Sequence, residues 1–269
     1  MKKTMVFAAV LVAMVAMAFV GCKKNGGADN SLEELKKRGE FVLGLDDSFP
    51  PMGFRDENNE IVGFDIDLAK EVAKRLGVTF RAQPINWDAK EQELSTGNID
   101  CIWNGLTITE ERLSMLSFTN PYLANEQVMV VRNNSGIKAL SDMAGKTVGL
   151  QAGSSAADAL DAAADFKKTL KGVVEFKENI TALNDLEIGG VDGVVMDSVV
   201  ANYSITATGK PFAVLPEGLA PESYGIAFRK NDIALTKAVQ GILEEMKADG
   251  TVGKISTKWF GSDITVIGK

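Results

Sequence analysis

Arg112 is a residue whose type and place in the sequence point to chemistry. It closes residues 98–112, which read NIDCIWNGLTITEER. This stretch begins as a strand that is apolar on both faces and ends as a short helix capped by Thr109. Ligands of open α/β sheets bind beyond the carboxyl ends of the strands, and a guanidinium fork placed there suits a carboxylate. The alternative is a surface arginine paired with Glu110 or Glu111.

Polar side chains stand at the carboxyl ends of other expected strands as well. Ser154 and Ser155 open a helix in the second half of the chain, where free N–H groups favour an anion. Asp197 ends an apolar run, where a bare carboxylate is costly without a cation. Arg112 and the N–H groups of Thr107 and Ser155 can together hold a carboxylate, and an aspartate can hold an ammonium. A molecule with both groups on one carbon is an α-amino acid.

Three further residues are placed to receive the side chain of such a ligand. Asp46 and Phe49 follow the first strand, and Trp87 precedes the second helix. The two aromatic rings can sandwich a side chain, and Asp46 can reach its polar end. Each residue also has a simpler explanation: core packing for the rings, a turn for Asp46, and a helix cap for Ser154 or Asp197. Their common placement at strand ends favours one shared site.

The elements that must position these residues follow the order β-α-β-α-β twice, which is typical of a mostly parallel sheet flanked by helices. In the first half they are residues 41–45, 65–76, 78–82, 89–96 and 99–103. In the second half they are residues 146–150, 155–170, 173–176, 180–188 and 193–196. Two C-terminal helices follow, over 232–249 and up to Phe260.

The two halves share a short template. Residues 94–102 and 186–194 both read Leu-x-x-Gly-x-β-branched-Asp-x-β-branched. Each copy leads into the third strand of its half, which favours two lobes of like architecture.

The chain is expected to cross between these lobes twice. Residues 127–132 form an extended segment that leaves the first lobe, and a return near 221–224 lets the C-terminal helices complete it. We therefore predict lobe 1 over 31–123 plus 222–269 and lobe 2 over 124–221, with a hinge and a cleft between them.

The first thirty residues are expected to lie outside the fold. Two lysines, an apolar run over 5–20 and a small-residue ending indicate a signal peptide over 1–21. The ending resembles the lipobox of bacterial lipoproteins, in which Cys22 is lipidated. Phe19 stands where the lipobox usually has Leu, so cleavage without lipidation is the alternative. Residues 22–30 then form a polar tether.

Composition excludes several functions. The net charge of −7 becomes −9 without residues 1–21, which hold two lysines and no acid, and this argues against nucleic acid and anionic lipid as partners. The chain has no histidine, which excludes His-based triads and His metal sites. Cys101 is the one cysteine of the expected fold, so no disulfide forms within it, and we expect no metal or cofactor.

Four stretches carry a family resemblance. They are residues 63–69 (GFDIDLA), residues 97–112 with their T-x-T-x-x-R ending, residues 118–122 (FTNPY) and residues 196–197 (MD). Together they resemble the solute-binding proteins of bacterial polar amino-acid ABC importers, the family 3 periplasmic binding proteins. The resemblance runs from about Ser31 to Phe260.

The resemblance implies the type II periplasmic-binding-protein fold, two α/β lobes that close on a ligand. It implies a lipid-anchored protein outside the cytoplasmic membrane that delivers a polar or basic L-amino acid, with Arg or Lys ahead of Gln, to an ABC permease. The implied ligand-binding residues are Arg112 with the backbone of Gly105, Thr107 and Ser155 for the carboxylate, Asp197 for the ammonium, Phe49 and Trp87 beside the side chain, and Asp46, Asn104 and Ser154 at its end.

An enzyme is the competing class. Exported relatives of this fold include cyclohexadienyl dehydratases, which use a carboxylic acid in the same cleft, and Glu91 or Glu126 are candidates for that acid. A complete zwitterion site needs no catalysis, so we expect a binding protein. Trp103 stands where many relatives have a smaller residue, and the sequence leaves open whether it faces the pocket.

Overall fold

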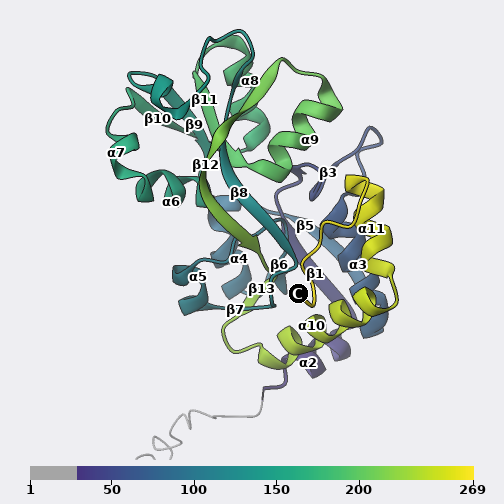
Figure 1. The fold of residues 1–269 in the computed structure, drawn as a ribbon. Helices are drawn as coiled ribbons and strands as arrows, with labels where there is room; N and C mark the ends of the chain where they lie inside the picture. The colour runs from purple at the N-terminus through teal and green to yellow at the C-terminus, as the bar shows by residue number, and fades with distance from the viewer. Residues whose placement is uncertain (1–28) are drawn as a thin grey trace, which may run out of the picture.

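The computed structural model describes residues 29–269. The expected signal peptide and the expected lipidation at Cys22 lie outside these residues. Figure 1 shows two lobes, one above the other, joined by two long strands. Within the described chain, no helix combines the length and the apolar character needed to cross a bilayer.

The sheet of lobe 1 has the strand order β5-β1-β6-β13-β7. Its strands are β1 (Glu40–Leu45), β5 (Thr79–Pro84), β6 (Cys101–Ile102), β7 (Leu116–Phe118) and β13 (Ala227–Arg229). β1 runs parallel to β5 and β6, whereas β13 runs antiparallel to β6 and β7. Because β13 comes late in the sequence, the chain returns to this lobe after building the other.

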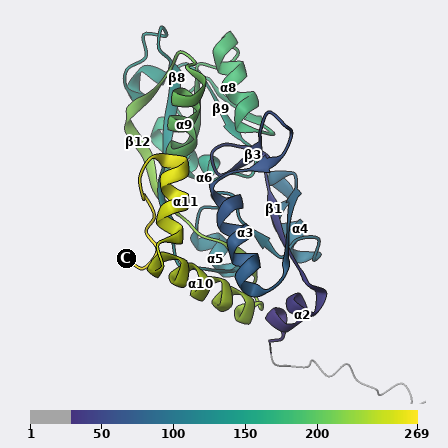
Figure 2. The same cartoon turned by 90° about the vertical axis from the view of Figure 1, so that its right-hand side faces the viewer.

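Helices cover both faces of this sheet. They are α2 (Ser31–Arg38), α3 (Phe64–Leu76), α4 (Lys90–Ser95) after the 3-10 turn η1 (Trp87–Ala89), α5 (Glu110–Met115), α10 (Ile233–Ala248) and α11 (Thr251–Phe260). The helix α3 buries Ala69, Val72 and Leu76, and Gly77 ends it with a φ of 78°. Figure 2 shows the C-terminal helix α11 lying beside α3. A small sheet of β2 (Ser48–Phe49), β3 (Gly53–Arg55) and β4 (Ile61–Val62) follows β1.

The sheet of lobe 2 has the order β10-β9-β11-β8-β12. Its strands are β8 (Leu123–Arg132), β9 (Thr147–Gln151), β10 (Gly172–Phe176), β11 (Gly193–Asp197) and β12 (Phe212–Tyr224). Its helical segments are η2 (Leu140–Met143), α6 (Ser155–Ala162), α7 (Ala164–Lys167), α8 (Asn179–Ile188) and α9 (Ser198–Thr208). The single helix expected over 155–170 is wrong, because the chain leaves the helical conformation at Ala163 (ψ 49°).

The repeated sequence template has the same structural role in both lobes. Asp100 Oδ2 accepts a hydrogen bond from Val42 N at 2.8 Å, and Asp192 Oδ2 accepts one from Thr147 N at 2.9 Å. Each aspartate thus ties the start of a third strand to the first strand beside it. In both sheets the first strand lies between the second and the third, an order that places a ligand site at the strand ends.

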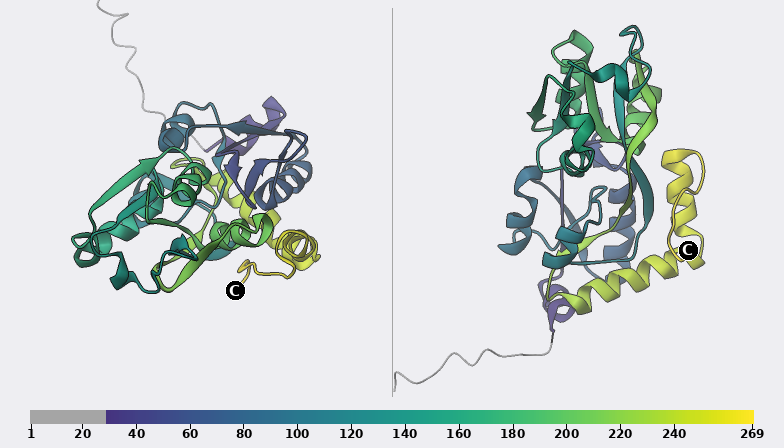
Figure 3. Two further views of the ribbon diagram at one scale, coloured as in Figure 1. Left: turned by 90° about the horizontal axis from the view of Figure 1, so that it is seen from above. Right: turned by 60° about the vertical axis from the view of Figure 1, so that its left-hand side comes forward.

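The strands β8 and β12 form the connection between the lobes. They pair antiparallel from Leu123 with Tyr224 to Arg132 with Phe212, with irregularities near Gly218. The right-hand view of Figure 3 shows both passing from the upper lobe into the lower one. Thr265, near the C-terminus, forms a bridge with Leu123 and so joins the end of the chain to this connection.

Candidate functional site

One cavity between the lobes gathers all ten side chains or backbone positions that the sequence predicts. It encloses about 290 Å³ of space, part of it open to solvent. Its lining comprises Asp46, Phe49, Trp87, Asn104, Gly105, Thr107, Arg112, Ser154, Ser155 and Asp197, together with Gln151. Most of them stand at or just beyond the end of a strand, and Arg112 lies in the short helix α5 that follows β6, so the structure brings the predicted residues together in one place.

Arg112 is held in the cavity wall with its charge largely unpaired. It is 8 % exposed, and Thr109 caps its short helix by accepting from Arg112 N. Its Nη1 donates to Thr107 O at 2.9 Å. Its contact with an acid is a long one, with Nε 4.0 Å from Glu91 Oε1. The alternative of a surface arginine paired with its helix neighbours is therefore wrong.

Backbone and hydroxyl groups from both lobes meet beside this guanidinium. Thr107 Oγ1 and Ser155 Oγ lie 3.0 Å apart across the cleft. Thr107 forms a bridge with Tyr224 in which the flanking residues make the hydrogen bonds, so the Thr107 N–H points away from that pair. Ser155 is the first residue of α6, whose N-terminal N–H groups favour an anion. Ser154 caps this helix by accepting from Ala156 N.

Asp197 is buried and firmly oriented. Its Oδ1 accepts hydrogen bonds from Tyr224 OH at 2.6 Å, Asn125 Nδ2 at 2.7 Å and Gln127 Nε2 at 3.0 Å. Its side chain does not cap α9. Asn125 caps this helix instead, because its Oδ1 accepts a hydrogen bond from Val199 N. Burial first, and the negative charge of Glu222 second, raise the pKa of Asp197 to about 7. A cation that reaches this carboxylate would relieve both effects.

Gly105 combines a left-handed backbone with close packing. Its φ is 61°, and an added Cβ would lie 3.0 Å from Phe49 Cε1 and 3.2 Å from Tyr224 Cε2. Its N–H donates to Asp65 Oδ2 at 2.9 Å. Since this hydrogen bond engages the N–H, the expected contact of the Gly105 backbone with the ligand carboxylate is not available, and the carbonyl is the backbone group that Gly105 can offer to a ligand.

The far end of the cavity carries a second buried carboxylate. Asp46 Oδ1 accepts from Ser48 N and Oγ at 2.9 and 2.7 Å, and its Oδ2 accepts from Gln151 Nε2 at 2.7 Å. Asn104 Oδ1 accepts from Asp46 N at 3.1 Å, and Asn104 Nδ2 is buried without a partner. Burial raises the pKa of Asp46, and the nearby charge of Glu178 adds to the effect.

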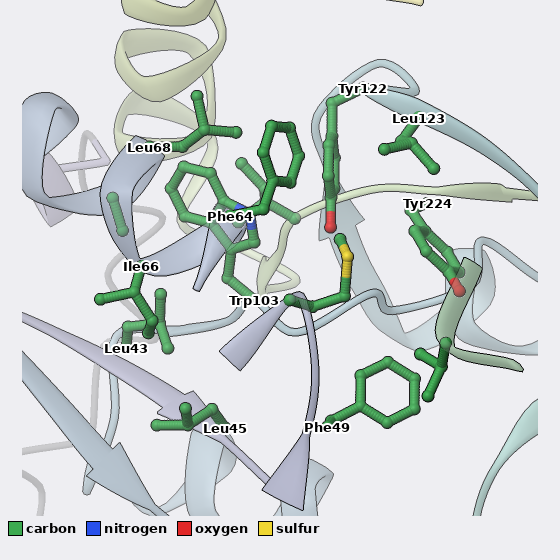
Figure 4. Close-up of a cluster of buried hydrophobic side chains, with 14 of the residues drawn as sticks. Leu43, Leu45, Phe49, Phe64, Ile66, Leu68, Trp103, Tyr122, Leu123 and Tyr224 are labelled. Carbon is green, nitrogen blue, oxygen red and sulfur yellow. The ribbon is translucent and has the colours of Figure 1, made fainter. Parts of the chain in front are cut away.

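Two aromatic side chains line the space between these ends. Phe49 and Trp87 are 5 % and 7 % exposed. The Nζ of Lys90 lies 5.3 Å from the centre of the Trp87 ring, so a cation already contacts this ring. Trp103, whose direction the sequence left open, is fully buried and packs edge-on against Tyr122 outside the cavity lining (Figure 4).

The lobes touch directly around the cavity. Besides the contact of Thr107 with Ser155, Gln151 Nε2 reaches Asp46 across the cleft, and Lys90 Nζ donates to Gly153 O at 2.8 Å. These contacts describe a closed arrangement of the two lobes.

Sequence reasoning missed several polar residues of this site. Gln151 ends β9 and satisfies the same strand-end rule as the predicted residues. Asn125 and Gln127 alternate along β8, and Glu222 and Tyr224 alternate along β12, a period that places each pair on one face. The signal in the sequence was that polar residues occupy alternate positions in these two crossing strands.

The carboxylic acids suggested for an enzyme do not line the cavity, although Glu91 lies 4.0 Å from Arg112 behind its wall. Glu91 and Glu126 are absent from the cavity lining. The Glu91 carboxylate lies 3.2 Å from Lys90 Nζ, and Glu126 is exposed on the hinge strand. The described residues also hold no group of three or more acidic or cysteine side chains able to bind a metal ion.

Comparison with protein families identifies the group to which this fold and cavity belong. Residues 41–262 match the model of the bacterial extracellular solute-binding proteins, family 3. This chain is a family 3 solute-binding protein. Family 3 proteins act outside the cytoplasm, and the fold is the two-lobed periplasmic-binding-protein fold.

Individual family 3 proteins are similar over most of their length. The L-cystine-binding protein TcyJ of Escherichia coli is 32% identical over 261 residues, covering 95% of this chain and 96% of TcyJ. The ABC transporter arginine-binding protein 1 of Escherichia coli is 32% identical, covering 81% of this chain and 89% of that protein.

Solved structures agree with this assignment. An ABC uptake transporter substrate-binding protein of Streptococcus pneumoniae with bound histidine has a TM-score of 0.86 and 38% identity, covering 89% of this chain and 99% of that chain. An ancestral amino acid-binding protein, described as a precursor of cyclohexadienyl dehydratase, has a TM-score of 0.78 and 35% identity, covering 86% of this chain and 99% of its own.

Proposed function

We propose that this protein captures a basic L-amino acid, arginine or lysine, in the cavity between its lobes and delivers it to an ABC permease. In this assignment Arg112, with the N–H groups of Thr107 and Ser155, holds the α-carboxylate, and Asp197 with the Gly105 carbonyl holds the α-ammonium. The side chain passes between Phe49 and Trp87 to the end formed by Asp46, Asn104, Gln151 and Ser154. The relatives named above bind amino acids, which supports the ligand class.

The proposed preference for a basic ligand rests on the charges of the buried residues that line the cavity. Asp46 and Asp197 both line the cavity and are each 5 % exposed, and neither forms an ion pair within residues 29–269. Arg112 is the one cationic side chain of the lining. A ligand with two positive groups and one negative group neutralises all three, whereas glutamine leaves Asp46 without a cation. Glutamine therefore ranks behind arginine and lysine.

The remaining parts of the proposal concern the setting of this site. We place lobe 1 at 31–123 plus 222–269 and lobe 2 at 124–221, so that both boundaries fall at the lobe 1 ends of β8 and β12. We also propose that Cys22 is lipidated and that residues 22–30 tether the protein outside the cytoplasmic membrane. Mass spectrometry of the mature N-terminus distinguishes a diacylated cysteine from simple cleavage.

A thermal-shift screen against the twenty amino acids tests the ligand assignment. At 100 times its dissociation constant a ligand adds about 2.7 kcal/mol to the stability of the folded state. We expect arginine and lysine to give the largest shifts. If no amino acid raises the unfolding temperature, the proposed function is wrong.

Asp46→Asn tests the role of the far carboxylate. The change removes a negative charge and retains an acceptor oxygen, so we expect arginine affinity to fall by about 10- to 100-fold, since a hydrogen bond to a charged group contributes about 1.5–3 kcal/mol. Glutamine affinity should change much less. Calorimetric titration measures both ligands, and Asp47→Asn is the matched control because Asp47 pairs with Arg55 outside the cavity. Equal losses for both ligands would contradict the role of Asp46.

The enzyme alternative has a direct test. A cyclohexadienyl dehydratase would convert prephenate, and the acids suggested for that step, Glu91 and Glu126, do not line the cavity. We expect no turnover of prephenate by the purified protein.

A further inference from the structure

A second carboxyl group reaches the ammonium end of the cavity from the hinge. Glu222 lies on β12, and its Oε2 accepts hydrogen bonds from Asn125 Nδ2 and Gln127 Nε2, both at 3.0 Å. Thr107 Oγ1 donates to the same oxygen at 2.9 Å. Because that hydroxyl gives its proton to Glu222, Ser155 is the donor in the contact between Ser155 and Thr107.

The same two amides bind Asp197, so they bridge two acids. Asn125 Nδ2 lies 2.7 Å from Asp197 Oδ1 and 3.0 Å from Glu222 Oε2, which places these two oxygens within about 6 Å of each other. Neither acid has an ion pair in the described chain, and the Arg112 guanidinium donates to the carbonyl oxygens of Thr107 and Gly153.

The cluster also has an acceptor without a donor. Gln127 is fully buried, and its Oε1 has no hydrogen-bond partner, while both protons of its amide point to acids or to Ser155. The buried carboxylate of Asp197, the half-buried carboxylate of Glu222 beside it and an unpartnered acceptor make a place where an additional proton or an ammonium group is stabilised.

We propose that the Asp197 carboxyl, held beside Glu222 by the two amides, carries a proton when no amino acid is bound, and that the ligand ammonium displaces this proton on binding. The carboxylic acid O–H bond breaks, the proton passes to the solvent, and the ammonium keeps its own protons. Glu222 is then a positioning residue that acts through Asp197 and Thr107. The inference rests on the proposed function, because it takes an amino-acid ammonium as the arriving cation.

The other groups around the pair are consistent with a proton held there. Burial, and then the charge of Glu222, raise the pKa of Asp197 to about 7. Burial next to Asp197 raises the pKa of Tyr224 well above its ordinary value, so this phenol stays neutral and donates. The β8 groups facing the pair are amides, and Arg112 is the cation that faces it from lobe 1.

The sign of the pH dependence follows from the displaced proton. Below the pKa of Asp197 the ligand must compete with the proton, so affinity falls as the pH falls. A single linked proton gives a loss of about tenfold per pH unit, and the affinity levels off above that pKa.

Calorimetric titration with arginine near pH 7, in two buffers of different ionisation enthalpy, counts the protons released. We expect the wild-type protein to release a measurable fraction of one proton. In Glu222→Gln we expect release to fall by at least half and the break in the affinity–pH profile to move to lower pH. Glu126→Gln is the matched control, because Glu126 is exposed on the paired hinge strand and outside the cavity lining; it should behave as wild type.

If the wild-type protein binds arginine without exchanging a proton between pH 6 and 8, this inference is wrong but the proposed function is not. The same conclusion follows if Glu222→Gln releases as many protons as the wild-type protein. Failure of every amino acid to bind would instead overturn the proposed function together with this inference. The wild-type measurement needs no variant, so the test stands even if Glu222→Gln does not fold.

Discussion

At the scale of single residues, the cavity depends on charges that are buried but oriented by neutral hydrogen-bonding groups. Arg112 is fixed by a carbonyl oxygen, and Asp197 by a phenol and two amides, so neither charge is cancelled by a protein partner. A ligand that supplies the missing counter-charges gains more there than in water, because the effective dielectric constant is lower.

Arg112→Ala should abolish useful affinity for an amino acid. The change leaves the ligand carboxylate without its cation in a buried place, which costs about 3 kcal/mol or more and corresponds to at least about 100-fold in affinity. Calorimetry with arginine measures the loss. Arg81→Ala is the control, since Arg81 is exposed and pairs with Glu40 on the sheet edge. An affinity within about threefold of wild type would contradict the assignment of Arg112 to the ligand carboxylate.

At the scale of elements, the turn between β9 and α6 brings lobe 2 into direct contact with lobe 1. Gly153 in this turn has a φ of 68°, and its carbonyl accepts from Lys90 Nζ at 2.8 Å and from Arg112 Nη2 at 3.4 Å. A Cβ added at this position would lie 3.0 Å from both Asp88 Cα and Asp88 Oδ1. This clash exists only while the lobes are closed.

Gly153→Ala should therefore weaken ligand binding more than it weakens the fold. Gly145→Ala is a matched control: its φ is 71°, so the backbone strain is similar, but an added Cβ meets nothing within 4 Å. We expect both variants to lose about 1 kcal/mol of stability, and Gly153→Ala alone to lose affinity for arginine. Small-angle scattering with ligand should show a larger radius of gyration for Gly153→Ala. Equal affinities in the two variants would contradict a role for this turn in closure.

At the scale of the whole molecule, two buried acids link global stability to pH. Burial raises the pKa of Asp65 to about 7, and the pKa of Asp197 is also raised to about 7. Asp65 is fully buried, and its Oδ2 accepts from Gly105 N and from the hydroxyl of Tyr122, a residue of the cluster in Figure 4. Between about pH 4 and 7 the folded state therefore binds more protons than the unfolded chain.

The unliganded protein should lose stability as the pH rises from 4 to 7 and change little above 8. The stabilisation by protonated Asp65 and Asp197 is complete below their unfolded pKa of 3.8 and is lost as the pH passes about 7. Thermal unfolding at fixed ionic strength measures the slope. Asp65→Asn and Asp197→Asn should each flatten it, and a wild-type slope in both variants would contradict the buried-acid explanation.

Particular residues show how much of the fold and of the candidate site could be predicted from the sequence. The ends of β1, β9 and β11 were evident from apolar runs that stop at polar residues, so Asp46, Ser154 and Asp197 were identified directly. The strand expected over 99–103 is only Cys101–Ile102, and the helix expected after Ser155 breaks at Ala163. Both differences arise from backbone pairing and packing that local periodicity does not encode.

The sequence by itself determined which residue types stand at the strand ends, and through its repeated template it determined two lobes built alike. Only the tertiary structure decided which of these residues face one another and how their charges are balanced. The physical reason is distance along the chain: Gln151 meets Asp46 across 105 residues and Gln127 meets Glu222 across 95. Burial, shared donors and raised pKa values are properties of such contacts, and they exist only once two hinge strands have set the lobes against each other.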